Sequence, residues 1–207
     1  LKPAKNYLKE FFAIAQDAVC YQENDIMLGL RYLNDLARKR GMPLVICVAL
    51  GTSFGGHNGD SLLADILDIY ATVRNRCVVV GTGNEAARRH HYFNRFTDAQ
   101  DMRTAEIRVG EGTQSFAVEL WSTLPNIVMV SVTSPSGERT GMIPVRLGYL
   151  FDFLFTFERT TITVEYRLLQ ENNDAQLVFI RFQNAVPGIW KIDIKPAMQT
   201  TGDFQIW

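Results

Sequence analysis

Two short apolar segments, each followed at once by a glycine-containing loop, flank a stretch with the period of an amphipathic helix. Leu44–Leu50 leads into Gly51-Thr52-Ser53, and Cys77–Val80 leads into Gly81-Thr82-Gly83-Asn84-Glu85. Short β-rich runs on either side of a helix predict a βαβ unit with parallel, buried strands. A right-handed crossover brings both loops to the carboxyl edge of the sheet. Open α/β sheets bind ligands at that edge, so these loops form the first candidate site.

Three helical segments are predicted in the first hundred residues. Asn24 or Asp25 is expected to cap a helix that ends in a basic turn at Arg38-Lys39-Arg40-Gly41. Its apolar stripe consists of Ile26, Leu30, Leu33 and Ala37. Asp60 or Ser61 is expected to cap the crossover helix, which runs to Tyr70. A third helix, or a helix followed by a turn, is predicted over Tyr7–Val19.

The apolar period changes to two after a boundary near Ala99–Thr104. Eight strands are predicted: Ala105–Val109, Ser115–Trp121, Ile127–Thr133, Met142–Leu147, Thr160–Leu168, Gln176–Phe182, Ile189–Ile194 and Asp203–Trp207. Turn sequences separate many of them, including Ser134-Pro135-Ser136-Gly137 and Glu171-Asn172-Asn173-Asp174. The fold class is therefore α/β plus all-β. An α/β segment over residues 1–100 precedes an antiparallel sandwich of jelly-roll type over residues 101–207.

Composition limits the class of protein. The chain has 207 residues, of which 47% are hydrophobic, which is enough to build a real core. The formal net charge of −1 predicts no electrostatic affinity for nucleic acid or for an anionic membrane surface. No apolar stretch approaches the roughly 20 residues that cross a bilayer. The expected partners therefore include neither nucleic acid nor membrane.

Cysteines and histidines suggest no metal site. Cys20, Cys47 and Cys77 are odd in number and lie in helical or strand patterns, so we expect buried thiols without a disulfide framework. His57 lies in a Gly-rich loop and is expected to form loop hydrogen bonds. His90 and His91 are adjacent and have no recognisable ligand spacing. No metal and no cofactor are expected.

The central segment resembles a known family. Residues 44–63 (LVICVALGTSFGGHNGDSLL) and 77–85 (CVVVGTGNE) resemble the middle of the subtilisin-like serine proteases, peptidase family S8. The match is best for the clostridial spore-germination proteases and their relatives in gut bacteria. Those proteases carry an inserted jelly roll, which Phe116–Trp121, Ser134–Glu138 and Pro187–Trp190 resemble closely. The resemblance covers nearly the whole chain.

The resemblance implies specific roles for the two loops. Ala49, Leu50 and Gly51 would pair with an extended peptide substrate. Gly81, Thr82 and Gly83 would line the specificity pocket, and the side chain of Asn84 would donate to the oxyanion. Alternatively, Asn84 would simply be a turn residue whose side chain bonds its own backbone. The resemblance also suggests an extracellular or spore-associated protein of a Gram-positive bacterium.

The three catalytic motifs of that family do not occur in this sequence. An Asp-Ser/Thr-Gly, a His-Gly-Thr-His and a Gly-Thr-Ser-Met/Val-Ala motif are all missing, and Gly51-Thr52-Ser53 precedes the Asn loop instead of following it. The chain is therefore interpreted as an internal fragment of a serine endopeptidase. Its partners would be a peptide or protein substrate and the segments that carry Asp, His and Ser. Alone, it would not hydrolyse peptides.

The sequence is also compatible with other functions. The longer protein could be a pseudoprotease, because some members of the germination subfamily are. The chain could also be a non-catalytic module whose sandwich binds a carbohydrate or a protein, or one that braces a protease domain. Trp121, Phe151, Phe153, Phe155, Trp190 and Trp207 are interpreted most simply as core residues. An exposed aromatic row among them would instead favour a carbohydrate-binding platform.

Overall fold

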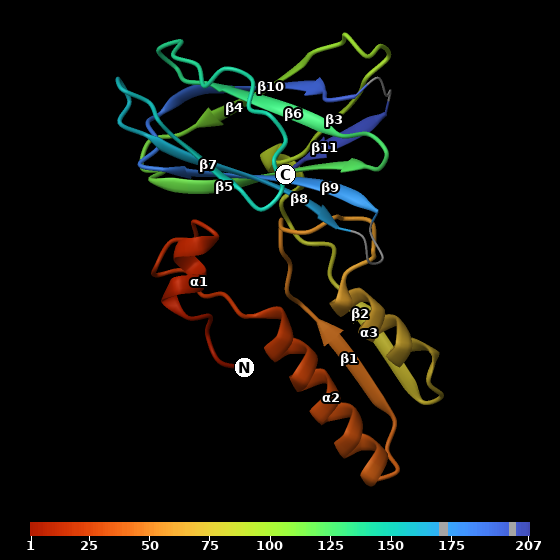
Figure 1. Cartoon of the computed structure of the whole chain (residues 1–207). Helices are drawn as coiled ribbons and strands as arrows, with labels where there is room; N and C mark the ends of the chain where they lie inside the picture. Colours follow the sequence, from red (N-terminus) through yellow and green to blue (C-terminus); the bar gives the residue numbers. More distant parts are fainter. Residues whose placement is uncertain (170–173, 199–201) are drawn as a thin grey trace. The chain divides into compact units, whose positions relative to one another are not determined.

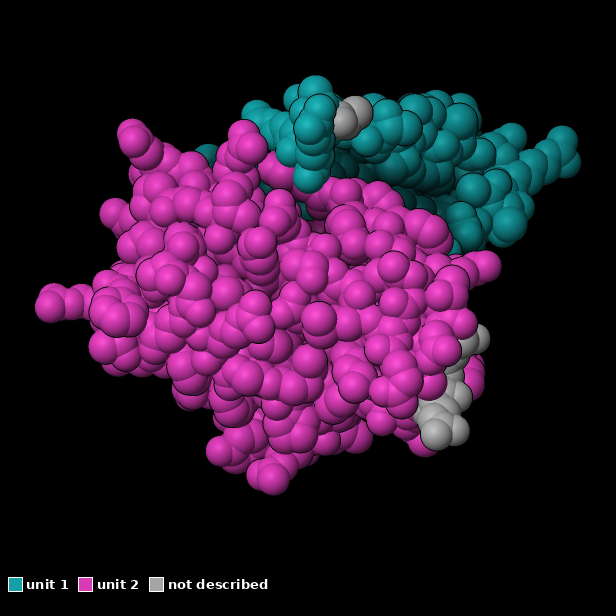
Figure 2. All heavy atoms as spheres, turned by 90° about the horizontal axis from the view of Figure 1, so that it is seen from above, with its two compact units in different colours: residues 1–9, 16–89 teal, residues 10–15, 90–207 magenta. Residues whose placement is uncertain are grey.

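The computed structural model describes residues 1–169, 174–198 and 202–207. The chain divides into two compact units (Figure 2). The first contains residues 1–9 and 16–89, and the second contains residues 10–15 and 90–207. The division falls before the boundary expected near Ala99–Thr104. The turn predicted at Glu171-Asn172-Asn173 lies outside the described residues.

The first unit contains a parallel strand pair connected by a helix (Figure 1). Its elements are α2 (Glu23–Lys39), β1 (Leu44–Val48), α3 (Leu62–Thr72) and β2 (Arg76–Val80). Strands β1 and β2 are parallel, and their register runs from the pair Leu44–Arg76 to the pair Val48–Val80. The predicted βαβ unit is therefore confirmed. A shorter helix, α1 (Asn6–Phe11), precedes these elements, and its last two residues belong to the second unit.

The two long helices begin differently. Ser61 accepts a hydrogen bond from the backbone N–H of Ala64 at 3.1 Å, which confirms it as the N-cap of α3. Helix α2 starts at Glu23, so the expected cap at Asn24 or Asp25 is wrong. The carboxamide oxygen of Asn24 instead accepts the backbone N–H of Asp25. Asn24 is already the second residue of the helix, and Gln22 occupies the N-cap position without a side-chain cap bond.

Only one face of the β1–β2 pair is covered within the first unit. Residues of α2 and α3 pack with Ile46 and Val48 in one apolar cluster. The alternate positions point the other way, and Val45 and Val79 are 68% and 49% exposed. Cys47 and Cys77 lie on this open face and are also exposed, while Cys20 is half-buried. The expectation of buried thiols is therefore wrong for Cys47 and Cys77, because it assumed a parallel sheet covered on both faces.

The second unit is a sandwich of two mostly antiparallel sheets (Figure 1). A three-stranded sheet has the order β4-β10-β6, and a six-stranded sheet has the order β3-β11-β5-β9-β8-β7. The strands are β3 (Tyr92–Arg95), β4 (Arg103–Val109), β5 (Ser115–Thr123), β6 (Val128–Thr133), β7 (Leu150–Leu154), β8 (Thr161–Leu169), β9 (Ala175–Gln183), β10 (Gly188–Pro196) and β11 (Asp203–Ile206).

Aromatic side chains fill the space between the two sheets. Trp190 of β10 is fully buried, and its ring contacts those of Phe155 and Phe182 edge-on at centroid distances of 5.0 and 5.4 Å. Such edge-to-face contacts combine large apolar area with favourable ring geometry. Phe182 also stacks on Phe116 of β5 at 4.4 Å. These residues form one core cluster with aliphatic residues from both sheets.

Two strands were missed by the sequence reading, and one predicted strand does not form. Strand β3 has only four residues, and it joins the sandwich by pairing with β11. Strand β7 follows the loop that ends at Tyr149 and pairs with β8. The segment Met142–Leu147 forms only isolated bridges, at Ile143 and at Leu147. Pro144 lies between these bridges and has no backbone N–H to contribute to a ladder.

Side chains take the place of a neighbouring strand along the outer edge of β6. Gln176 of β9 is fully buried; its carboxamide accepts from the N–H of Val128 at 2.7 Å and donates to the carbonyl of Val128 at 3.0 Å. Further along β6, the hydroxyl of Tyr166 accepts from the N–H of Val130, and that of Thr140 accepts from the N–H of Val132. Backbone groups that would otherwise be buried without partners are thereby satisfied. Two of these three side chains come from the opposite sheet and therefore tie the layers together.

We expect Gln176→Leu to lower the free energy of unfolding by about 2–4 kcal/mol, because both polar groups of Val128 lose their partner inside the core. Urea unfolding monitored by tryptophan fluorescence measures the change. Gln183→Leu on the same strand is the matched control, since Gln183 is exposed and should change stability by less than about 0.5 kcal/mol. Equal effects of the two substitutions would contradict the proposed role of the inter-sheet amide.

Candidate functional site

The parallel register brings the two predicted loops together. Val48 and Val80 form the last register pair of β1 and β2. One step further, the N–H of Gly81 donates to the carbonyl of Val48 at 3.1 Å. The loops that start at Ala49 and Gly81 therefore leave the same sheet edge side by side, as the sequence predicted.

The first loop keeps its opening residues exposed. Ala49, Leu50 and Gly51 are all accessible, with Leu50 43% exposed. The rest of the loop is held by its own hydrogen bonds. The hydroxyl of Thr52 accepts from the N–H of Phe54 at 3.0 Å, and a ring nitrogen of His57 lies 3.2 Å from the Ser53 carbonyl. The loop hydrogen bond expected of His57 is therefore present, and the residues at the start of the loop remain exposed.

The second loop presents an amide side chain on a glycine-rich backbone. Gly81, Thr82, Gly83 and Asn84 are all exposed. Gly83 has φ of +78°, a backbone region that residues with a Cβ rarely occupy. Among the described residues, no hydrogen bond is found for the carboxamide of Asn84. That amide is therefore available as a neutral donor.

The loop residues that the resemblance assigns to substrate binding are uncharged. Residues 49–54 and 81–84 carry no ionisable side chain. The first charged pair is Glu85 with Arg88, whose atoms approach to 3.1 Å across the short 3₁₀ helix η1 (Ala86–Arg88). The pair is exposed and contributes little to stability. Residues 49–54 and 81–84 therefore supply hydrogen-bonding groups but no His, Asp or Glu that could act as a base.

The remaining histidines have local structural partners. His91 stacks on Trp207 at 4.6 Å, and its ring nitrogen lies 3.0 Å from the carboxamide oxygen of Gln205. His90 is exposed next to it. Over residues 1–169, 174–198 and 202–207, no cluster of three or more His, Cys, Asp or Glu side chains has a metal-binding arrangement. In the same ranges, no helix is both long enough and apolar enough to cross a membrane.

Sequence reasoning missed one surface beside the loops. The open face of the β1–β2 pair carries Val45, Cys47, Cys77 and Val79 immediately before the loop residues. The alternation of exposure along β1 reveals this face, but the sequence shows both faces as uniformly apolar. The runs LVICV and RCVVV therefore read as doubly buried strands, although one face is uncovered in the first unit.

No protein-family model matches the sequence, and a comparison with curated proteins gives no match. Among solved structures, the chain is similar to the CspB protease of Clostridium perfringens, with a TM-score of 0.80 and 23% sequence identity. The similarity covers 93% of this chain and 41% of the CspB chain, so the chain spans less than half the length of that protein. At this identity the likeness shows a shared fold alone, with a small parallel sheet and helices in one unit and mostly antiparallel sheets in the other.

The positive φ of Gly83 in the Asn84 loop gives a testable expectation. Gly83→Ala should lower the stability of the loop by about 1–2 kcal/mol, because a Cβ disfavours φ of +78°. Amide hydrogen exchange of Gly81–Glu85 reports this opening directly. Gly51→Ala is the control, since Gly51 has open space around it and its φ lies outside the positive range. Gly83→Asn should lie between them, because Asn tolerates the left-handed region. Equal exchange in all three variants would show that a Cβ at position 83 does not disfavour the loop conformation.

Proposed function

We propose that this chain is the central part of a subtilisin-like serine endopeptidase of the clostridial germination type. The observation that carries the proposal is the parallel register of β1 and β2, which sets Ala49–Gly51 and Gly81–Asn84 at one sheet edge. The fold shared with the CspB protease supports it. The reaction class is peptide-bond hydrolysis by acyl transfer.

Each loop has a distinct role in this proposal. The backbone of Leu50 and Gly51, both exposed residues, holds an extended substrate by strand-like hydrogen bonds. Gly81, Thr82 and Gly83 line the pocket for the side chain before the scissile bond, where glycines allow close approach. Asn84 donates its side-chain N–H to the oxygen that becomes negative in the tetrahedral intermediate. A neutral amide is suited to this task because it needs no change of protonation.

The nucleophile and its base come from other parts of the proposed protease. A serine attacks the substrate carbonyl, a histidine takes the serine proton, and an aspartate orients the histidine. None of the three family motifs occurs among these 207 residues. The proposal therefore assigns substrate binding and oxyanion stabilisation to this chain and proton transfer to the segments that complete it.

The open face of the parallel pair supports the fragment interpretation. Parallel sheets are normally covered on both faces, and two strands alone seldom form a stable sheet. Here the described residues provide two parallel strands, with helices on one face. The other face exposes Val45 and Val79. Further strands and helices of a longer protein would cover it.

We further propose that the second unit is a jelly-roll insert. Supporting this, the chain changes sheet at every connection from β3 to β11 except β7–β8 and β8–β9. Several neighbouring strands are consequently far apart in sequence, as in β4-β10-β6 and β3-β11-β5. Interleaving of this kind is typical of double Greek-key sandwiches.

The carbohydrate-binding alternative has less support. Phe155 and Trp190 are fully buried, Trp121 is 8% exposed, and Phe151, Phe153 and Trp207 are half-buried. These six aromatic residues thus provide no exposed row on which a sugar could stack. No observation favours this function over the protease proposal.

Asn84→Ala in the complete protease is expected to lower kcat by roughly 100- to 1,000-fold with little change in KM, because the donor acts mainly in the transition state. Steady-state hydrolysis of a chromogenic peptide measures both constants. Asn58→Ala is the matched control: Asn58 is an exposed loop residue that accepts the N–H of Asp60, and its loss should leave kcat within about twofold. If Asn84→Ala instead raised KM alone, the oxyanion assignment would be wrong.

Thiol reactivity tests the fragment interpretation separately. In the isolated chain Cys47 and Cys77 should react rapidly with Ellman's reagent, because both are exposed. In the complete protease, covering the open sheet face should slow both reactions by at least about tenfold. Cys47→Ser and Cys77→Ser variants assign the reaction to each thiol. Equal rates in the two proteins would show that nothing covers this face.

A further inference from the structure

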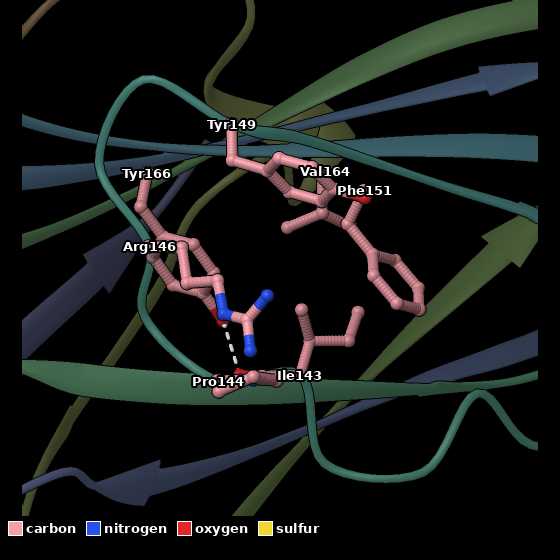
Figure 3. Close-up of a pocket in the computed structure, with 7 residues that line it drawn as sticks. All are labelled: Ile143, Pro144, Arg146, Tyr149, Phe151, Val164 and Tyr166. Carbon is pink, nitrogen blue, oxygen red and sulfur yellow. Dashed lines mark hydrogen bonds between the residues drawn. The ribbon is translucent and has the colours of Figure 1, made fainter.

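A pocket of about 230 Å³ opens at one edge of the sandwich (Figure 3). None of its lining residues belongs to the two loops described above. It lies entirely in the second unit, between the segment 143–149 and strands β7 and β8. Its lining consists of Ile143, Pro144, Arg146, Tyr149, Phe151, Val164 and Tyr166. A space of this size accepts one aromatic or branched side chain.

Hydrogen bonds fix the frame of this pocket. Ile143 bridges to Val130 of the three-stranded sheet, and Leu147 bridges to Tyr166 of the six-stranded sheet. The hydroxyl of Tyr166 donates to the Ile143 carbonyl at 2.9 Å and accepts from the N–H of Val130 at 3.2 Å. Burial raises the pKa of this hydroxyl to about 12, so it stays neutral. The pocket is therefore preformed, and its phenol is already engaged.

The floor of the pocket is apolar and its rim is exposed. Ile143, Val164 and Tyr166 are each at most 2% exposed. Tyr149 forms part of the wall but remains 56% exposed, and Leu147 beside it is 55% exposed. Large apolar side chains grouped at the mouth of a cavity are typical of a binding surface.

Arg146 provides the only ionised group of the lining residues. Its guanidinium extends into the space between Tyr166 and Ile143 (Figure 3). Among the described residues, no ion pair or hydrogen bond is found for it. A guanidinium without a partner at the mouth of an apolar pocket is suited to bind a carboxylate in bidentate geometry.

Nearby acidic side chains do not neutralise Arg146. Glu165 and Asp152 alternate with the lining residues Val164 and Phe151, so they point to the opposite face of the sheet. There, Glu165 pairs with Arg167 at 2.7 Å, and Asp152 accepts from the Thr163 hydroxyl at 2.7 Å. The pocket therefore combines apolar walls with one positive charge.

We propose that this pocket binds a carboxylate attached to an apolar group the size of one amino-acid side chain. Arg146 binds the carboxylate, and the ring or branched chain rests on Ile143 and Val164. The same chemistry is found in the C-terminal residue of a peptide and in a free aromatic or branched carboxylic acid. This site is independent of the proposed protease function.

Isothermal titration of the full chain with three probes tests the ligand class. N-acetylphenylalanine should bind saturably, and N-acetylphenylalanine amide should bind at least about tenfold more weakly, because it lacks the charge that Arg146 recognises. Acetate, which has no apolar group, should show no saturable binding. Equal affinity for acid and amide, or no binding of the acid up to about 10 mM, would overturn the proposal.

Variants locate the binding to this pocket. Arg146→Met should abolish the preference for acid over amide, and Arg146→Lys should retain part of it. Arg108→Met is the control, since Arg108 is an exposed arginine on β4 that does not line the pocket. Thermal melts check that all three variants are folded. An unchanged preference in Arg146→Met would exclude Arg146 as the carboxylate ligand and overturn the proposal.

A short peptide ending in phenylalanine distinguishes the two sources. If its free-acid form binds at least as tightly as N-acetylphenylalanine, and its amidated form does not, the pocket receives peptide C-termini. If only the single-residue acid binds, the pocket is restricted to small carboxylic acids. Both results support the ligand class, whereas binding of the amidated peptide alone contradicts it.

Discussion

The parallel register between β1 and β2 is the constraint on which the candidate site depends. A parallel pair can form only if the connecting segment crosses over, and helix α3 provides that crossover. Because the two strands end at the pair Val48–Val80, both following loops start at the same point along the carboxyl edge of the sheet. A slip of one residue would move the Gly81 N–H away from the Val48 carbonyl and would reverse which side chains face the helices. The geometry assigned to Asn84 therefore follows from backbone pairing several residues earlier.

In the second unit, the unpaired backbone groups at the edge of a short sheet need hydrogen-bond partners. Strand β6 lies at the end of the order β4-β10-β6, so half of its peptide groups lack a neighbouring strand. Gln176 and Tyr166 reach these groups from the opposite sheet. Polar side chains in an apolar core would be costly by themselves, but here their partners are equally buried. The Tyr166 hydroxyl also donates to the Ile143 carbonyl, so the same side chain that serves this edge fixes the start of the segment 143–149 beside the pocket.

Local signals predicted much of this fold. The apolar runs around residues 44–50 and 77–80 and the cap at Ser61 depend on neighbours in sequence, and the structure confirms them. Strand β3 depends instead on β11, which lies about a hundred residues later, and its own four residues are too few to show a period. The exposure of Cys47 depends on whether a second layer covers the sheet, which no local pattern records. Likewise, the Arg146 pocket arises where two sheets meet, and its lining residues come from three separate segments.

The open face of the first unit has a consequence for handling and for synthesis of the protein. Strands β1 and β2 have the sequences LVICV and RCVVV, in which Arg76 is the single charged residue. Edge strands of soluble proteins usually carry charges, prolines or bulges that prevent pairing with other chains. These two carry none on the exposed face, where β-branched side chains and thiols alternate. As long as this face is uncovered, it therefore exposes a template for strand-by-strand aggregation and thiols for intermolecular oxidation.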